Sequence, residues 1–123
     1  QAKYRHIVTE LSDYQGILFE TDGLQKALAK ARKENKAVFV DCYTSWCGPC
    51  KMMKPVLEEL KKKMGNKIII LKIDIDKNIS LSSEYRIQSV PTLVLWKQGE
   101  IIWRQSGALS LNELEQILSS YIR

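Results

Sequence analysis

The sequence predicts an α/β protein with a central mixed β-sheet, in which parallel strands are joined by a C-terminal antiparallel hairpin and helices flank both faces. Short apolar strands alternate with helical segments along the chain, which is typical of parallel pairing. The segment 37–43 is apolar almost throughout, as expected of a central strand that is covered on both faces. A Gln98-Gly99 pair between two apolar runs indicates the tight turn of the hairpin.

The length and the charge of the chain exclude several classes of protein. It has 123 residues, and 19 Lys plus Arg against 14 Asp plus Glu give a net charge of +5. This length suits one domain, which we place at 17–123 after a mixed polar lead-in at 1–16. The apolar runs are shorter than the ~18 residues of a membrane span, and no nucleic-acid-binding motif accompanies the positive charge. We therefore expect a monomer with no nucleic-acid partner and no stable membrane insertion.

The first strand is expected at 17–20 and the first helix at about 22–34. Asp22, with Gln25 three residues later, is typical of a helix start in which Asp is the N-cap. Apolar residues at helical spacing mark the buried face of this helix, namely Leu24, Ala27, Leu28 and Ala31.

A second helix is expected from about 47 to 63, after the central strand. Pro55 inside it predicts a kink, because proline lacks an N–H and collides with the carbonyl of Lys51. Its apolar stripe consists of Val56, Leu57, Leu60 and Met64. Its solvated C-terminal end, where cations favour the helix dipole, is expected to carry Lys61, Lys62 and Lys63.

The rest of the chain continues the alternation. Further strands are expected at 67–73, 92–96 and 101–103, with a short helix at 80–85. Ser110 and Glu113 form the pattern of a capping box that opens the last helix. The core face of this helix is predicted to carry Leu111, Leu114, Ile117, Leu118 and Tyr121.

The pair of cysteines in Trp46-Cys47-Gly48-Pro49-Cys50 is the sharpest chemical feature. Cys47 falls at the N-terminus of the second helix, where unsatisfied N–H groups stabilise negative charge. We therefore expect the pKa of this thiol to fall and its reactivity to rise. Cys50 lies one helical turn away, close enough to form a disulfide, and opening and closing that ring is two-electron dithiol chemistry.

Three other readings of this pair are weaker. A structural zinc site requires about four ligands, and outside the pair the chain offers only Cys42 and His6. A c-type haem site requires a histidine where Lys51 stands. A purely structural disulfide this short would constrain little of the chain. No metal and no cofactor other than the redox-active Cys47–Cys50 disulfide is expected.

Three segments resemble the thioredoxin family. The run Val40-Asp41-Cys42-Tyr43-Thr44-Ser45-Trp46-Cys47-Gly48-Pro49-Cys50-Lys51 resembles its active-site segment. Val90-Pro91-Thr92 resembles its cis-proline loop, and Ser106-Gly107-Ala108-Leu109-Ser110 resembles the segment before its last helix. The resemblance covers about 17–123 and implies the thioredoxin fold.

The resemblance also implies roles for individual residues. Cys47 would attack a substrate disulfide and Cys50 would resolve the mixed disulfide. Asp41 matches the buried acid that manages the proton of the resolving thiol, and Lys72 matches the lysine that accompanies it. The residues alone indicate only that Asp41 sits in an apolar strand, where desolvation should raise its pKa. A strand-end carboxyl bonded to a backbone N–H is the alternative.

Substrate binding is implied for the residues around the cysteine pair. The Val90–Pro91 bond would be cis, and the backbone of Val90 would pair with an extended polypeptide. The implied substrate-binding residues are Trp46, Gly48, Pro49, Val90, Pro91, Gly107 and Ala108.

Two residues depart from the family pattern, which usually has Phe-Trp after the acid. Cys42 is interpreted as a buried small hydrophobe in the central strand, with a third redox or regulatory thiol as the alternative. Tyr43 keeps the aromatic bulk but changes the packing near Asp41.

The sequence therefore predicts a thiol–disulfide oxidoreductase that reduces protein disulfides, with disulfide-containing clients and an upstream thiol reductant as partners. A disulfide oxidase or isomerase is the alternative, and a non-catalytic binding module is a third. The absence of a histidine between Cys47 and Cys50 favours the reductase. The start at Gln1 suggests a removed leader, hence a periplasmic or other extracytoplasmic location, with the cytoplasm as the alternative.

Overall fold

The computed structural model of the chain describes residues 8–12, 16–20 and 23–122, the first two ranges by their backbone alone. Within these ranges a six-stranded sheet has the order β2-β1-β4-β3-β5-β6. The strands are β1 (Val8–Ser12), β2 (Gly16–Glu20), β3 (Ala37–Tyr43), β4 (Ile68–Asp74), β5 (Thr92–Lys97) and β6 (Glu100–Ser106). The helices are α1 (Gly23–Glu34), α2 (Gly48–Met64), α3 (Ile79–Glu84) and α4 (Leu111–Tyr121), with 3₁₀ turns η1 (Gly65–Lys67) and η2 (Ile75–Lys77).

The sheet is mixed, as predicted, but parallel pairing is confined to β3 and β4 among the described strands. β5 returns on the other side of β3 and pairs with it antiparallel. β6 pairs with β5 in the predicted hairpin, and β1 runs antiparallel to both β2 and β4. The β3-α2-β4 crossover is therefore the parallel unit around which the sheet is built.

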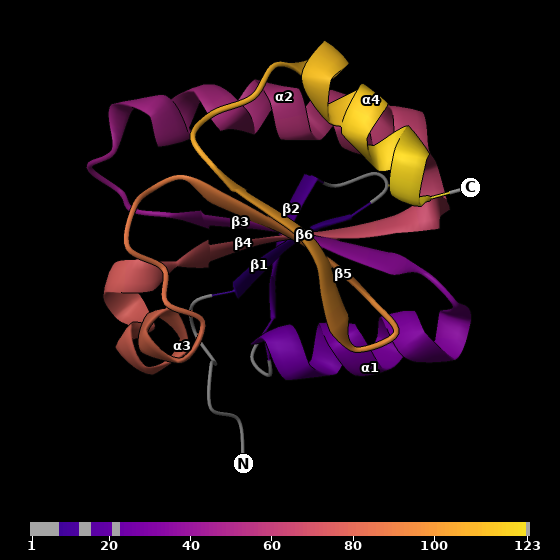
Figure 1. Cartoon of the computed structure of the whole chain (residues 1–123), viewed down its shortest axis with the longest axis horizontal. Coiled ribbons are helices and arrows are strands. Elements are labelled where there is room, and N and C mark those ends of the chain that lie inside the picture. Colours follow the sequence, from indigo (N-terminus) through magenta and orange to yellow (C-terminus); the bar gives the residue numbers. More distant parts are fainter. Residues whose placement is uncertain (1–7, 13–15, 21–22, 123) are drawn as a thin grey trace.

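Helices cover the sheet on both faces (Figure 1). Alternate residues of β3 supply both cores, because successive side chains of a strand point to opposite faces. Val38, Val40 and Cys42 pack with α1 and α3, whereas Ala37 and Phe39 pack with α2 and α4. Both faces of β3 are buried, which confirms the prediction of a central strand.

The strand β1 was missed by sequence analysis, which placed a polar lead-in at 1–16. It lies between β2 and β4 in the sheet, so its backbone has a hydrogen-bonding neighbour on each side. Its sequence, VTELS, mixes apolar and polar residues and carries no strong strand signal. The position of this strand is therefore set by its backbone pairing, and its side-chain pattern does not predict it.

The other elements agree with the predictions to within a few residues at their ends. The helix α1 begins at Gly23, and Asp22, its expected N-cap, lies outside the described residues. The helix α2 continues through Pro55, and the kink expected there stays a prediction. The capping box at Ser110 and Glu113 is formed, with both reciprocal hydrogen bonds present.

The prediction that Tyr121 belongs to the core face of α4 is wrong. Its side chain is 41% exposed, whereas Leu114 and Leu118 are fully buried. The helix ends at Tyr121, and the next residue adopts an extended conformation. Ile122 therefore turns toward the core and packs there instead.

The prediction that Lys61 is solvated at the end of α2 is also wrong. Its side chain is only 8% exposed, and its Nζ donates to the Gly65 carbonyl at 3.0 Å and to the Ile68 carbonyl at 2.8 Å. Helix α2 leaves its last carbonyl groups without intrahelical donors, and this ammonium group serves the turn that follows it. Lys61 thus joins the end of α2 to the start of β4.

Replacing Lys61 with methionine should destabilise the fold, because it leaves buried carbonyl groups without their donor. We expect Lys61→Met to lower the free energy of unfolding by about 1–3 kcal/mol, measured by urea denaturation. The matched control is Lys62→Met, since Lys62 is exposed and forms a surface salt bridge with Glu59 at 3.6 Å. That change should stay within about 0.5 kcal/mol, and equal losses in the two variants would refute the assigned role.

Candidate active site

Cys47 and Cys50 form a disulfide at the N-terminus of α2, with their Cα atoms 5.2 Å apart. Cys47 is the N-cap residue, with an extended backbone, and its Sγ accepts a hydrogen bond from the Cys50 N–H at 3.1 Å. Pro49 occupies the first turn, where its missing N–H is not needed. The sulfur of Cys47 therefore stands where a helix stabilises negative charge, as predicted from the sequence.

The two cysteines are almost buried themselves, with 4% of Cys47 and 2% of Cys50 exposed. Their neighbours Gly48 and Pro49 are exposed, and Trp46 is 70% exposed. The almost buried disulfide is therefore flanked by exposed residues.

The Asp41 carboxyl is fully buried, and neither of its oxygens has a hydrogen-bond partner among the described residues. The expected alternative, a carboxyl bonded to a backbone N–H, is therefore not the one found. Strand alternation places Asp41 on the same face as Phe39, which is the face that α2 covers. Burial raises the pKa of Asp41 from 3.8 to about 7, and the positive charge of Lys72 partly opposes that rise.

Lys72 lies where the sequence placed it, beside the buried acid. In the parallel register of β3 and β4 it stands opposite Asp41. Its Nζ lies over the ring of Tyr43, 4.6 Å from the ring centroid. Sequence analysis noted Tyr43 for its aromatic bulk and its packing near Asp41, but it did not predict this contact with Lys72.

Three loops meet at the end of the sheet where β3 stops (Figure 1). The start of β5 lies beside the end of β3, with Thr92 opposite Cys42. The Val90–Pro91 bond is cis, as expected. The Gly107 N–H donates to the Pro91 carbonyl at 2.8 Å, so the loop before β5 is tied to the loop before α4.

The structure brings the predicted substrate-binding residues to this end of the sheet with different exposures. Pro91 is buried and Val90 is half-buried. The exposed members are Trp46, Gly48, Pro49, Gly107 and Ala108. Their binding roles stay predictions.

Asp76 belongs to this site and was missed by sequence analysis. Its Oδ2 accepts a hydrogen bond from the Trp46 indole N–H at 2.8 Å, and it lies in η2, directly after β4. The pattern Asp74-Ile75-Asp76 at the end of a buried strand was the signal, because parallel strands bring their carboxyl ends to one edge. The hydrogen bond fixes the orientation of an exposed aromatic side chain.

Cys42 is a free cysteine on the opposite face of β3 from Asp41. It is 2% exposed, which confirms its interpretation as a buried residue. Burial, together with the nearby Asp41 carboxyl, raises the pKa of its thiol to about 12. The thiolate that exchange chemistry requires is therefore strongly disfavoured at this position.

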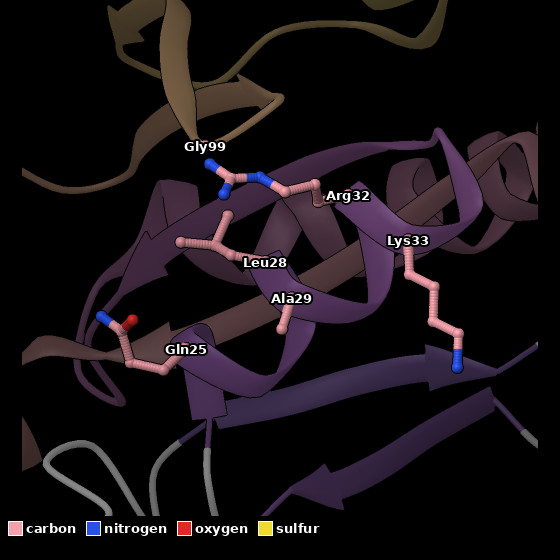
Figure 2. A pocket seen from close by; sticks show the side chains of 6 residues that line it. All are labelled: Gln25, Leu28, Ala29, Arg32, Lys33 and Gly99. Atoms are coloured by element: carbon pink, nitrogen blue, oxygen red, sulfur yellow. The ribbon is translucent and has the colours of Figure 1, made fainter.

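A cleft of about 440 Å³ lies away from the cysteine pair, between α1 and the turn of the β5–β6 hairpin. Figure 2 shows the Arg32 guanidinium reaching toward Gly99 across this cleft. Gly99 has a φ of +81°, and a Cβ there would come within 2.3 Å of the Arg32 side chain. The other lining residues are Gln25, Leu28, Ala29 and Lys33. None of them is a cysteine, and the cleft adds nothing to the thiol chemistry.

The described part of the chain contains neither a candidate membrane span nor a candidate metal site. No helix there has both the length and the apolar character needed to cross a membrane. No group of three or more His, Cys, Asp or Glu side chains within the same residues is arranged to hold a metal ion.

The raised pKa of Asp41 should make the stability of the disulfide form depend on pH. The carboxyl ionises near 3.8 in the unfolded chain but near 7 in the folded protein, so between these values the folded protein binds the extra proton. The free energy of unfolding should therefore fall as the pH rises from about 4 to about 7, and level off above that. Asp41→Asn removes this dependence, because an amide does not ionise.

We compare the free energy of unfolding of Asp41→Asn with that of the wild-type protein. The difference should shift in favour of Asp41→Asn by up to about 4 kcal/mol as the pH rises from 4 to 7. Urea unfolding of the disulfide forms at several pH values measures this difference. Glu59→Gln is the matched control, since it removes an exposed carboxyl from α2 and should leave the pH dependence almost unchanged. Parallel pH curves for wild type and Asp41→Asn would contradict the assignment.

Comparisons with known proteins agree with this geometry. The model of the family described as Thioredoxin matches residues 17–120. The thioredoxin of Buchnera aphidicola is 40% identical over 103 residues, which cover 84% of this chain and 93% of that protein. The chloroplastic thioredoxin Y of rice is 43% identical over 88 residues, which cover 72% of this chain but only 52% of that protein.

A solved structure supports the same assignment. A mutant thioredoxin from Halobacterium salinarum aligns with a TM-score of 0.71 at 36% identity, covering 80% of this chain and 86% of that one. The disulfide at the start of α2, the cis-proline and the matches in sequence and structure lead to one conclusion. The chain belongs to the thioredoxin family of thiol–disulfide oxidoreductases, and Cys47 and Cys50 form its CxxC disulfide.

Proposed function

We propose that the protein reduces disulfides of client proteins, with Cys47 as the attacking thiolate and Cys50 as the resolving thiol. The observation that carries this proposal is the Cys47–Cys50 disulfide at the start of α2. Cys47 is the N-cap of the helix, where an N–H already points at its sulfur. A negative charge on that sulfur is favoured there, whereas Cys50 lies inside the first turn.

The reaction consists of two exchanges. The Cys47 thiolate attacks one sulfur of the client disulfide, forms a mixed disulfide and releases the other client sulfur as a thiolate. The Cys50 thiol then loses its proton and attacks the Cys47 sulfur. This closes the Cys47–Cys50 disulfide and releases the second client thiolate. The client gains two electrons, and the protein loses two.

Asp41 is the proposed acceptor of the Cys50 proton. A carboxyl whose pKa is about 7 is ionised in part of the molecules at neutral pH and can take up a proton there. An ordinary aspartate would be fully ionised and a weaker base. The lack of a hydrogen-bond partner among the described residues leaves both oxygens available, directly or through a water molecule.

The client is proposed to bind as an extended polypeptide along the loop before β5. The half-buried Val90 would offer its backbone there, while the exposed side chain of Trp46 would contact apolar residues of the client. These contacts would depend on the backbone of a client more than on its side chains. The proposal is therefore that many different protein disulfides serve as substrates.

The proposed cycle ends with the protein oxidised, so an upstream dithiol reductant must return two electrons before the next client. The expectations of a monomer without nucleic acid, and of an extracytoplasmic location, stay predictions.

Single cysteine substitutions should separate the proposed roles. We expect Cys47→Ser to abolish reduction of an insulin-like disulfide substrate, because it removes the attacking thiolate. Cys50→Ser should accumulate a mixed disulfide with the client, visible by mass spectrometry under non-reducing conditions. Cys42→Ala is the matched control and should retain activity, since this thiol is buried on the other face. Activity that survives Cys47→Ser would overturn the proposal.

The reduction potential distinguishes the reductase from the oxidase or isomerase. We expect equilibration of the Cys47–Cys50 pair with glutathione to give a strongly reducing value. The absence of a histidine between the two cysteines supports this direction, because no imidazolium stabilises the reduced form. An oxidising value would instead favour disulfide formation as the function.

A further inference from the structure

The ring of Tyr43 holds the ammonium group of Lys72, and both lie next to the buried acid. The Lys72 Nζ is 4.6 Å from the Tyr43 ring centroid. In the register of β3 and β4, Lys72 is opposite Asp41 and Asp74 is opposite Tyr43. Asp41 and Tyr43 are two residues apart on one strand and therefore share a face. Lys72 thus stands beside the acid and within reach of the ring.

This contact restrains a side chain that would otherwise be free to turn toward water. Lysine carries a strongly hydrated point charge on a flexible stem, and Lys72 is only half-buried. An ammonium over an aromatic face is attracted by the negative potential of the ring. This attraction favours one position of the charge over several solvated ones.

We propose that Tyr43 is a positioning residue for proton transfer at Cys50. Its ring holds the Lys72 ammonium beside the Asp41 carboxyl and so sets the electrostatic potential at that carboxyl. The proposal rests on the proposed role of Asp41 in the reaction. It assigns the effect to the face of the ring and not to the phenol hydroxyl.

Other charged and titratable groups around Asp41 are few among the described residues. On β3, the Cys42 thiol points to the other face of the sheet. On β4, Asp74 lies two residues beyond Lys72, and its Oδ1 accepts the Asp76 N–H at 3.0 Å. On α2, Cys50 is buried, while Lys51 and Lys54 are exposed. Lys72 is the cation that lowers the pKa of Asp41 against the effect of burial.

The test follows the Asp41 carboxyl by NMR titration of the disulfide form, which requires no turnover. Loss of the ring should let Lys72 move away, so the carboxylate loses part of its stabilisation. We expect Tyr43→Leu to raise the titration midpoint of Asp41 by about 0.5 pH unit. Tyr43→Phe is the matched control and should leave the midpoint where it is, because it keeps the ring.

A second background shows whether the ring acts through Lys72. Lys72→Met should raise the Asp41 midpoint, and Tyr43→Leu should then add no further shift, because the coupled partner is gone. The proposal is overturned if Tyr43→Leu lowers the midpoint or leaves it unchanged. It is equally overturned if the same upward shift persists in the Lys72→Met background, since the ring would then act by shielding the carboxyl.

The outcome is separable from that of the proposed function. If Asp41 is not the proton acceptor, client reduction by Asp41→Asn keeps the wild-type pH profile, whereas the titration shifts above still report on the ring. If the roles of Asp41 and Tyr43 are both correct, the pH profile of client reduction by Tyr43→Leu shifts to higher pH together with the Asp41 midpoint. Folding of each variant is verified by its urea unfolding transition.

Discussion

The burial of the β3–β4 pair between two layers of helices is the constraint on which the rest of the structure depends. A parallel pair requires a crossover, and α2 supplies it, so the helix begins at the edge where β3 ends. That edge receives the cysteine disulfide from α2 and Asp76 from the turn after β4. The antiparallel return of β5 brings the cis-proline to the same place.

The same burial gives the site its electrostatic character. A carboxyl placed in the layer under α2 is shielded from bulk solvent, and this burial raises the pKa of Asp41 to about 7. Lys72 acts against this shift from the neighbouring strand. In the proposed mechanism the resolving step requires a proton acceptor near neutral pH, and an aspartate with an ordinary pKa would be a weaker base.

Sequence pattern predicted the parts of this protein that depend on side-chain periodicity or on a motif. The cysteine pair, the buried acid and the central strand were all identified in this way. β1 was missed because its place is set by backbone pairing on both sides. Lys61 and Asp76 were missed because their partners are a carbonyl and an indole brought near by the fold, which a linear pattern does not contain.

The burial of Cys42 also limits which covalent isomers the protein can form. A chain with three cysteines has three possible pairings, and two of them would use Cys42. Its sulfur faces the α1 and α3 side of the sheet, and its thiol stays protonated at physiological pH. Scrambling within the molecule would therefore require the sheet to open. The native fold therefore keeps the Cys42 sulfur out of disulfide exchange. An unfolded chain in oxidising conditions could form the two disulfides that involve Cys42.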